Sequence, residues 1–493
     1  MEFSVADILE ATRGRLVQGA AEARLTGVST DSRSVRPQDL FIAIPGERFD
    51  GHRFVGAALA AGAGAALVAR WPLDESSSES TSEPLVATRP IVQVEDTVAA
   101  YGALAAWWRA KMPARVIAIS GSNGKTTCKD MTGHLLEALG PTIRSEGSHN
   151  NHIGVPETLL RIRPEHAFAV VELGTNHPGE LERLAALVLP NVAVITNIGP
   201  SHLEAFGSVR GVAAEKAKLL DFRAADHLAV LHADDPWSRR LAARHAGAKT
   251  TFGLSADADW RAEAIWAEND RLRFIIAGWP KPFAVPVFGR HQVANCLAAL
   301  AVASAMGLGL PDAADRFLSF APPKWRMNFR RIGDLNLIVD CYNANPASMK
   351  AAIEDLAHRP VPGRRVAMLA DMLELGRGSA AAHRKLGLLI AQAGFDLLCV
   401  YGERARLVAR AALAYGMSSA SVFHTTDRAL AAHWLCQRLR RTDTVLVKGS
   451  RGMRLEEVAE ALEGWGRIHG FPRAELAAPG AALAGGLATS AGG

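Results

Sequence analysis

The sequence predicts an α/β protein of three domains, two of which contain a parallel sheet. The chain has 493 residues, whereas a single hydrophobic core stops growing at about 250 to 300 residues. Short apolar runs alternate with helical stretches in two long regions, as they do in parallel sheets covered by helices on both faces. We therefore expect a small α/β domain at 1–95, a central parallel-sheet domain at 96–315, a Rossmann-like domain at 316–475 and a disordered tail at 476–493.

The composition is that of a globular protein without a nucleic-acid surface. Apolar residues make up 49% and charged residues 21% of the chain, so most of it should fold. The net charge of +5 comes without a dense Lys/Arg tract interleaved with aromatic residues. The five cysteines form no CxxC pair, which argues against a zinc site or a disulfide framework. We expect buried, reduced thiols.

The sequence contains no predicted export or membrane segment. The N-terminus, MEFSVADILEATRG, has acidic residues and helical periodicity where a signal peptide needs a basic flank. The longest apolar run, Val55 to Ala69, is short and interrupted by glycines, so it is interpreted as a helix leading into a strand. We expect a cytoplasmic monomer. A Ser-rich polar run between Trp71 and Pro84 is expected to be a mobile loop.

The stretch VIAISGSNGKTT, residues 116–127, predicts a nucleoside triphosphate site. A short apolar strand enters a glycine-bracketed turn that leads into a helix start, and such turns present backbone N–H groups to phosphates. The generic phosphate-loop pattern has an earlier glycine where this chain has Ile119, so an ordinary βα turn is the alternative. The candidate phosphate-binding residues are Gly121, Ser122, Asn123, Gly124, Lys125, Thr126 and Thr127.

Polar residues follow the next two predicted strands of the central domain. Glu172 lies near the end of the strand Phe168 to Leu173, and His202 follows the strand Val192 to Thr196. Ligands of open α/β sheets lie outside the carboxyl ends of the strands, where these side chains should meet the phosphate loop. Carboxylate, threonine oxygen and neutral imidazole are suitable ligands for Mg²⁺. Each residue alone has a structural alternative, but their common placement favours a metal site.

The other two domains also carry polar segments at predicted turns and strand ends. In the first domain, residues 29–33 can hydrogen-bond a polar ligand or form a capped turn. In the third domain, segments 340–346, 371–376 and 448–451 follow predicted strands. The expected strands there are Leu335–Val339, Arg365–Leu369, Leu397–Tyr401 and Val445–Lys448.

Over nearly its whole length the chain resembles the Mur ligase family, the ATP-dependent amide-forming enzymes of peptidoglycan precursor synthesis. The resemblance rests on the motifs GSNGKTTCKDM, NNHIGVPETLL, VVELGTNHPGE, DCYNANPASM, DMLELG and LVKGSRGM in this order. The phosphate loop of the family begins at the position of Gly121, so Ile119 fits its pattern. The motifs are most similar to the branch that joins D-alanyl-D-alanine to UDP-N-acetylmuramoyl-tripeptide.

The resemblance implies two Mg²⁺ sites beside the phosphates of ATP. Thr126 and Glu172 would be ligands of the first Mg²⁺, and His202 would serve the second. A carbamylated lysine would bridge to that second metal. Lys216 fits the family spacing better than Lys218, which remains the alternative. Carbamylation would turn a repelling ammonium into an oxygen donor. The catalytic residues would be Lys125, Glu172, His202 and Lys216.

The resemblance also implies nucleotide and substrate contacts. Nucleotide-contacting residues would be Asn295, Arg326, Asp340, Tyr342 and Asn343, although KWRMNFR departs from the usual pattern around Arg326. The UDP-sugar site would contain Ser29, Thr30, Asp31, Ser32 and Arg33. Other substrate contacts would be Asn151, with Lys448, Ser450 and Arg451 at the peptide end.

The reaction implied is amide formation through an acyl phosphate. The substrate carboxylate would attack the γ-phosphate of ATP, and the amine of D-alanyl-D-alanine would then displace phosphate. Within the same superfamily, the alternatives are the ligase adding the third peptide residue and a folate polyglutamate synthase. A nucleotide-regulated binding protein that uses the phosphate loop as a switch is the alternative from another class.

Overall fold

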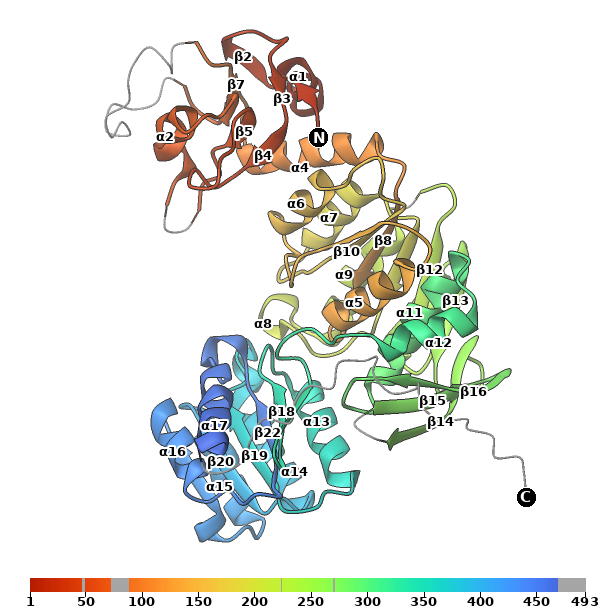
Figure 1. The fold of residues 1–493 in the computed structure, drawn as a ribbon, viewed down its shortest axis with the longest axis vertical. Coiled ribbons are helices and arrows are strands. Elements are labelled where there is room, and N and C mark those ends of the chain that lie inside the picture. Colours follow the sequence, from red (N-terminus) through yellow and green to blue (C-terminus); the bar gives the residue numbers. More distant parts are fainter. Residues whose placement is uncertain (47–48, 72–87, 223, 269–270, 469–493) are drawn as a thin grey trace, which may run out of the picture.

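The computed structural model describes residues 1–468 except 47–48, 72–87, 223 and 269–270. Besides the two-stranded pair β1-β3, three larger sheets follow one another along the molecule, and strand β8, which leads into the phosphate loop, belongs to the middle one (Figure 1). The predicted Ser-rich loop and the predicted tail fall largely or wholly outside the described residues. The domain boundaries near 95 and 315 remain predictions.

The first sheet has five strands in the order β2-β7-β6-β5-β4, with β2 antiparallel to β7 and the others parallel. The expected helix-to-strand segment in Val55 to Ala69 is present as a short helix and a buried strand. The elements are β1 Phe3–Ser4, α1 Val5–Thr12, β2 Arg15–Gln18, β3 Arg24–Leu25, β4 Gly27–Ser29, β5 Asp39–Ile42, η1 Gly51–Phe54, α2 Val55–Ala60, β6 Ala65–Val68, β7 Ile91–Gln93 and α4 Thr97–Ala110.

The central sheet has nine strands in the order β16-β15-β14-β13-β12-β11-β8-β10-β9, and the six strands from β9 to β13 are parallel. Their register brings the strand ends together, since Glu172 pairs with Ile119 and Ile195 pairs with Ser120. The phosphate loop, Glu172 and the segment after β11 therefore share one edge. The elements are β8 Arg115–Ser120, α5 Lys125–Leu136, β9 Thr142–Arg144, α6 Gly154–Leu160, β10 Phe168–Glu172, α7 Glu180–Val188, β11 Val192–Ile195, α8 Leu203–Phe206, α9 Val209–Ala217, η3 Lys218–Leu220, β12 Leu228–His232, α10 Pro236–Arg244, β13 Ala248–Gly253, β14 Trp260–Glu268, β15 Arg271–Ile276, β16 Trp279–Val285, α11 Gln292–Ala305 and α12 Leu310–Leu318.

The third sheet has six strands in the order β17-β18-β22-β19-β20-β21, of which only β17 is antiparallel to its neighbour. Its four predicted strands are confirmed within one residue at each end. The elements are β17 Asn328–Ile332, β18 Leu335–Asp340, α13 Pro346–His358, β19 Arg365–Ala370, η4 Gly376–Gly378, α14 Ser379–Gln392, β20 Leu397–Tyr401, α15 Arg406–Ala414, η5 Ser419–Ser421, β21 Val422–Thr425, α16 Arg428–Cys436, β22 Thr444–Lys448, η6 Arg451–Met453 and α17 Glu456–Ile468.

The central sheet has an antiparallel extension that the sequence analysis did not predict. Strand β14 pairs in parallel with β13 and then forms an antiparallel meander with β15 and β16. The signal was an alternation, because Leu272, Phe274 and Ile276 are buried at every second position of β15. The meander and α12 enclose a second apolar core beneath α5 and α11.

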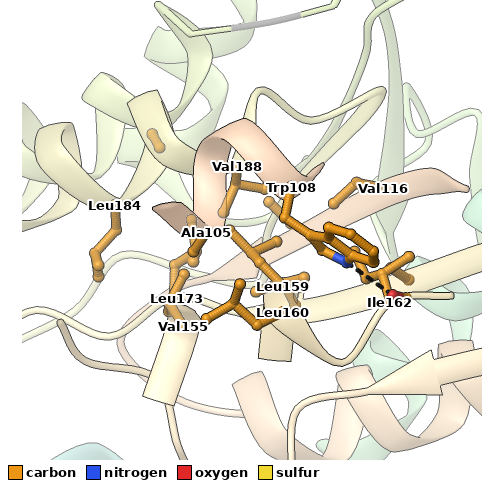
Figure 2. Close-up of a cluster of buried hydrophobic side chains, with 14 of the residues drawn as sticks. Ala105, Trp108, Val116, Val155, Leu159, Leu160, Ile162, Leu173, Leu184 and Val188 are labelled. Atoms are coloured by element: carbon orange, nitrogen blue, oxygen red, sulfur yellow. Dashed lines mark hydrogen bonds between the residues drawn. The ribbon is translucent and has the colours of Figure 1, made fainter. Parts of the chain in front are cut away.

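Trp107 and Trp108 both belong to helix α4, and Trp108 is a core residue. Trp108 is 6% exposed, and its indole Nε1 donates a hydrogen bond of 2.9 Å to the carbonyl oxygen of Ile162 (Figure 2). The same cluster contains Leu159 and Val188 from the helices that α4 covers. Trp107 is only partly buried, with the Lys111 ammonium 3.6 Å from its ring centroid.

Replacing Trp108 with alanine is expected to destabilise the protein strongly. Removal of a buried indole leaves a cavity and takes away one of the two hydrogen bonds to the Ile162 carbonyl oxygen, at a cost of about 3 to 5 kcal/mol. Chemical denaturation followed by circular dichroism measures this loss, with Trp107→Ala as the partly exposed control. A loss for Trp108→Ala no larger than that of the control would contradict the core assignment.

Two other predictions from the sequence concern the described part of the chain. None of its helices combines the length and the apolar character needed to cross a bilayer. The five cysteines form no disulfide, four of them are buried and Cys436 is partly buried. Burial raises the pKa of the Cys399 thiol to about 12, so it stays protonated.

Candidate active site

Two glycines give the phosphate loop its shape. Gly121 has φ +147° and Gly124 has φ +80°, a region that side-chain-bearing residues rarely adopt. A Cβ at Gly121 would collide with Thr196 Oγ1, and one at Gly124 would collide with Asn295 Oδ1. Helix α5 begins directly after Gly124, so its free N–H groups face the space beside the loop. The loop is also tied to the segment after β11, since Ser122 Oγ donates to Gly199 O at 3.0 Å.

Lys125 and Thr126 start helix α5 beneath this loop. The Lys125 ammonium donates a hydrogen bond of 2.9 Å to the carbonyl oxygen of Gly121. Burial lowers its pKa, Glu172 opposes that effect, and the Arg326 charge adds to it. Thr126 is buried, and its hydroxyl has no hydrogen-bond partner among the residues that the structure describes. Thr127 is also buried.

Glu172 is a buried carboxylate with one satisfied oxygen and one free oxygen. The residue is 1% exposed, and its Oε1 accepts a hydrogen bond of 2.7 Å from Asn150 Nδ2. Its Oε2 has no hydrogen-bond partner in the described part of the chain. Buried polar atoms are nearly always paired, so two orphan oxygens at one strand edge, Thr126 Oγ1 and Glu172 Oε2, fit a bound cation. Both are hard donors that suit Mg²⁺.

Lys216 and Lys218 lie in very different surroundings. Lys216 is 3% exposed on α9, and its ammonium donates a 3.2 Å hydrogen bond to Ser120 Oγ at the end of β8. Burial, with the nearby Lys125 charge, holds the pKa of Lys216 well below its usual range. Lys218 is half-exposed and pairs with Glu182 at 3.5 Å. Of the two lysines, only Lys216 faces the phosphate loop.

His202 follows β11 at the carboxyl edge of the central sheet, just before α8. Its Nδ1 is 3.1 Å from Glu374 Oε2, a residue of the third sheet's domain. Burial lowers the pKa of His202, Glu374 raises it, and the charges of Lys125 and Lys216 lower it further. The imidazole is therefore neutral near pH 7, the form that ligates metals. Within the described ranges, no three His, Cys, Asp or Glu side chains gather in a metal-binding arrangement.

A cavity of about 360 Å³ adjoins the phosphate loop between the central and third sheets. Asn295 lines it and donates through Nδ2 to Gln292 Oε1 at 2.7 Å. Arg326 lines it as well, with its guanidinium 4.1 Å from the ring centroid of Tyr342. Predicted nucleotide residues that line this cavity are Asn123, Gly124, Thr127, Asn295, Arg326 and Asp340.

Lys448 also lines this cavity, although the resemblance suggested the peptide end for it. Its ammonium is 2.5 Å from Asp340 Oδ2 and donates to Asn343 O at 3.1 Å. The reason is the register of the third sheet, in which Lys448 on β22 pairs with Asp340 on β18. The side-chain oxygen of Asn343 accepts its neighbour's backbone N–H, so this amide is used locally.

The other residues assigned to the peptide end lie beside this pair. Ser450 is buried, and its hydroxyl accepts a 3.0 Å hydrogen bond from the backbone N–H of Leu373. Arg451 is half-exposed, forms an ion pair with Glu456 and has its guanidinium 4.6 Å from the ring centroid of Trp325. Only Arg451 has a charge that a substrate could reach.

A second cavity, of about 830 Å³, lies between α4 and the carboxyl edge of the central sheet. Asn150, Asn151 and Thr175 line it, together with Glu180 and Arg183 of α7. Asn151 also caps α6, since its Oδ1 accepts the N–H groups of Ile153 and Gly154. This predicted substrate residue therefore has a structural role besides its place in the cavity wall.

Residues 29–33 form a tight polar turn in the first sheet's domain. The Ser29 hydroxyl donates to Asp31 O at 2.9 Å, and the Arg33 guanidinium forms an ion pair of 2.7 Å with Asp31. The Arg33 hydrogen bonds lower the pKa of Asp31 to about 2, so the carboxylate stays charged. Thr30 and Arg33 are exposed and Ser32 is partly exposed. None of the five lines either cavity described above.

The structure adds residues that the sequence analysis missed. Asn150 and Ser120 contact Glu172 and Lys216, and Lys129 is a fully buried lysine on α5. Each lies next to a residue that the motifs singled out. The signal was the unusual density of polar residues within GSNGKTTCKDM and SHNN, but no local pattern shows which residues these side chains contact.

Comparison with known proteins places this geometry in a family. Three family profiles match, described as "Mur ligase family, catalytic domain" at 24–109, "Mur ligase middle domain" at 119–303 and "Mur ligase, glutamate ligase domain" at 325–451. The UDP-N-acetylmuramoyl-tripeptide–D-alanyl-D-alanine ligase of Escherichia coli K12 is 35% identical over 479 residues, which cover 94% of this chain and 99% of that relative.

The chain belongs to the Mur ligase family.

Solved structures agree with this assignment. The crystal structure of MurF from Acinetobacter baumannii superposes on this Mur ligase with a TM-score of 0.83 at 31% identity, covering 94% of this chain and 99% of that one. The MurF ligase of Thermotoga maritima in complex with ADP gives a TM-score of 0.78 at 27% identity, covering 90% and 98%. The predicted three-domain α/β fold is therefore confirmed.

Proposed function

We propose that this Mur ligase uses ATP to join D-alanyl-D-alanine to UDP-N-acetylmuramoyl-tripeptide, giving the UDP-muramoyl-pentapeptide. The observation that carries the proposal is the match, over 99% of its length, to a relative named for that reaction. The ADP complex of the Thermotoga ligase supports ATP use. Addition of the third peptide residue instead is not favoured, because the near-full-length relatives are named for the dipeptide reaction.

The phosphate loop holds ATP in this proposal. Gly121 to Gly124 and the start of α5 present backbone N–H groups to the phosphates, and Lys125 adds a positive charge. The nucleoside occupies the 360 Å³ cavity between Asn295, Asp340 and Arg326. Lys448 fixes Asp340 by its buried ion pair, so this carboxylate is oriented before the nucleotide arrives.

Thr126 and Glu172 would hold Mg²⁺ through their two unpaired oxygens. A cation held there would supply positive charge to the phosphates of ATP. His202 and a carbamate on Lys216 would hold a second Mg²⁺. The surroundings of Lys216 favour the modification, because a buried amine with a lowered pKa is neutral, and a neutral amine reacts with CO2.

The UDP-sugar tripeptide lies on the side of Glu172 that faces away from the nucleotide cavity. Its uridine diphosphate end binds the turn at 29–33, where Arg33 is available to a phosphate, and its peptide passes through the 830 Å³ cavity. The terminal carboxylate attacks the γ-phosphorus of ATP, the bond from that phosphorus to the β,γ-bridging oxygen breaks, and an acyl phosphate and ADP are formed. The dipeptide amine then attacks the acyl carbon, the acyl–oxygen bond breaks as phosphate leaves, and the nitrogen releases a proton to give the amide.

The third domain closes over the phosphate loop to bring the dipeptide amine to this carbon. Asn345 Nδ2 donates a hydrogen bond of 2.6 Å to Asn123 Oδ1 of the loop, and the Tyr342 hydroxyl bonds to Ser148. Such contacts assemble the site from two domains, and proximity contributes much of the rate. Arg451 is suited to the carboxylate of the incoming dipeptide.

The chain works as a cytoplasmic monomer in this proposal. One copy supplies both cavities and every proposed ligand, so a partner subunit is not needed for the chemistry. Consumption of ATP places the reaction where ATP is abundant. Sedimentation at working concentrations tests the monomer.

The assignment is tested by ATP-dependent phosphate release from the purified protein. With UDP-N-acetylmuramoyl-tripeptide present, release and a pentapeptide product are expected with D-alanyl-D-alanine, and neither with L-alanyl-L-alanine or single amino acids. Mass spectrometry identifies the product. Release with a single amino acid would instead assign the chain to a sister ligase, and release without any amine would favour a nucleotide switch.

A further inference from the structure

The carboxylate of Glu172 is held by a neighbour that the proposed mechanism does not use. We propose that Asn150 is a positioning residue, which binds one oxygen of Glu172 and thereby directs the other toward the divalent cation. The inference rests on the proposed role of Glu172 as a metal ligand. It adds that a separate loop, residues 145–151, sets the orientation of that ligand.

The first observation is that the two carboxylate oxygens of Glu172 differ in their hydrogen bonding. Oε1 accepts from Asn150 Nδ2 at 2.7 Å, whereas Oε2 is buried without a hydrogen-bond partner among the described residues. A carboxylate only accepts hydrogen bonds, so the amide nitrogen of Asn150 must be the group that faces it. This hydrogen bond leaves Oε2 as the one oxygen able to serve a cation.

The second observation is that Asn150 is itself fixed on both sides. Its backbone carbonyl oxygen accepts a 2.8 Å hydrogen bond from the backbone N–H of Gly174, just beyond the end of β10. A Cβ at Gly174 would collide with Asn150 Oδ1, so the glycine makes room for the amide. The backbone of Asn150 is therefore anchored to the segment that follows Glu172, and its side chain packs against Gly174 while donating to Glu172.

The third observation explains how the 145–151 loop is held against the phosphate-loop helix. Lys129 of α5 is 1% exposed, and its ammonium donates to the carbonyl oxygens of Ser145 and Gly147 at 2.8 Å each. The Ser145 hydroxyl in turn accepts the backbone N–H of Glu172 at 3.0 Å. A buried charge costs free energy unless it is fully paired, so these contacts define one geometry for the loop.

These contacts form a continuous path from helix α5 to the free oxygen of Glu172. Lys129 fixes the loop, the loop carries Asn150, and Asn150 sets the carboxylate. Asn150 also lines the 830 Å³ cavity, so the residue that orients the metal ligand is in contact with the proposed peptide path. Loss of an outer hydrogen bond to a metal ligand typically lowers metal affinity about 10- to 100-fold.

The test measures Mn²⁺ binding by electron paramagnetic resonance, in the presence of a non-hydrolysable ATP analogue, for Asn150→Ala and for Asn150→Leu, which preserves side-chain size. The expected result is affinity about 10- to 100-fold weaker than that of the unmodified protein. Asn191→Ala is the matched control, since Asn191 Nδ2 donates a hydrogen bond of the same 2.7 Å length to Asp226, away from the site. The control should lose stability but keep its Mn²⁺ affinity.

Mn²⁺ affinities within twofold of the unmodified protein for both Asn150 variants would overturn the inference, as would an equal loss in Asn191→Ala. Should the alanine variant fail to fold, the leucine variant decides between the same two results. The readout needs no peptide substrate. A weakened affinity in a protein that forms no pentapeptide would therefore support the role of Asn150 while refuting the proposed reaction.

Discussion

Replacing Lys125 with methionine is expected to lower kcat about 10²- to 10³-fold with little change in folding. The Lys125 ammonium lies beside the phosphate loop and donates a hydrogen bond to the carbonyl oxygen of Gly121. Methionine keeps the aliphatic part of the side chain but removes the positive charge. That charge stabilises the transition state of γ-phosphoryl transfer more than it stabilises bound ATP. Steady-state pentapeptide synthesis, with ATP varied, separates kcat from the KM for ATP.

A second lysine provides the control for this variant. Lys249 also donates to carbonyl oxygens, those of Ala242 and His245 at 2.7 and 3.1 Å, but it lies on β13 away from both cavities. Lys249→Met therefore removes a comparable lysine while leaving kcat unchanged. If Lys125→Met retains more than a tenth of the activity, the phosphate loop does not stabilise the transferred phosphoryl group as proposed.

The parallel strands of the fold could be predicted because a short apolar run in the sequence is enough to indicate each of them. The strand Leu397–Tyr401 has the ends that the sequence predicts, since it is a short apolar run between Asp396 and Gly402. Parallel sheets are buried on both faces, so such runs are conspicuous. The meander β14 to β16 is not indicated by such a run, because β15 alternates buried and partly exposed residues.

The candidate site was predictable only where one segment carries it. The phosphate loop could be recognised because its glycines, lysine and threonine are contiguous in sequence. The pairs Glu172–Asn150 and Lys216–Ser120 join residues 22 and 96 positions apart, and no spacing rule connects them. Lys448 was assigned to the peptide end from its motif, but the register of β18 and β22 places it beside Asp340. That register cannot be read from the motif.

Burial also separates residues that the sequence treats alike. Lys216 and Lys218 are two positions apart, where α9 passes into η3, and the spacing alone left both as candidates for carbamylation. The structure buries Lys216 against Ser120 and leaves Lys218 half-exposed beside Glu182. A helix places residues two positions apart on different faces, so only one of the pair faces the site.

Lys216→Met is expected to lower ligase activity about 10²- to 10³-fold, because a carbamate that contributes charge stabilisation at the reacting phosphate is lost. The enzyme without substitutions should lose activity when CO2 and bicarbonate are removed and regain it when they are restored. Labelled bicarbonate should give a carbamate signal in carbon-13 NMR. Lys218→Met, two residues away, is the control that keeps both the activity and the signal.

The same substitution should stabilise the protein when no carbamate is present. Because the folded-state pKa of Lys216 is lowered, the unfolded chain binds more protons at this amine and unfolding is favoured below its usual pKa. That cost falls as pH rises toward about 10.4, the ordinary value for lysine. In CO2-free buffer, Lys216→Met should therefore have the higher Tm at pH 7, and the difference should shrink as the pH is raised. A variant that is less active but also less stable at pH 7 would instead make Lys216 a structural residue, and a carbamate signal lost only in Lys218→Met would move the modification to Lys218.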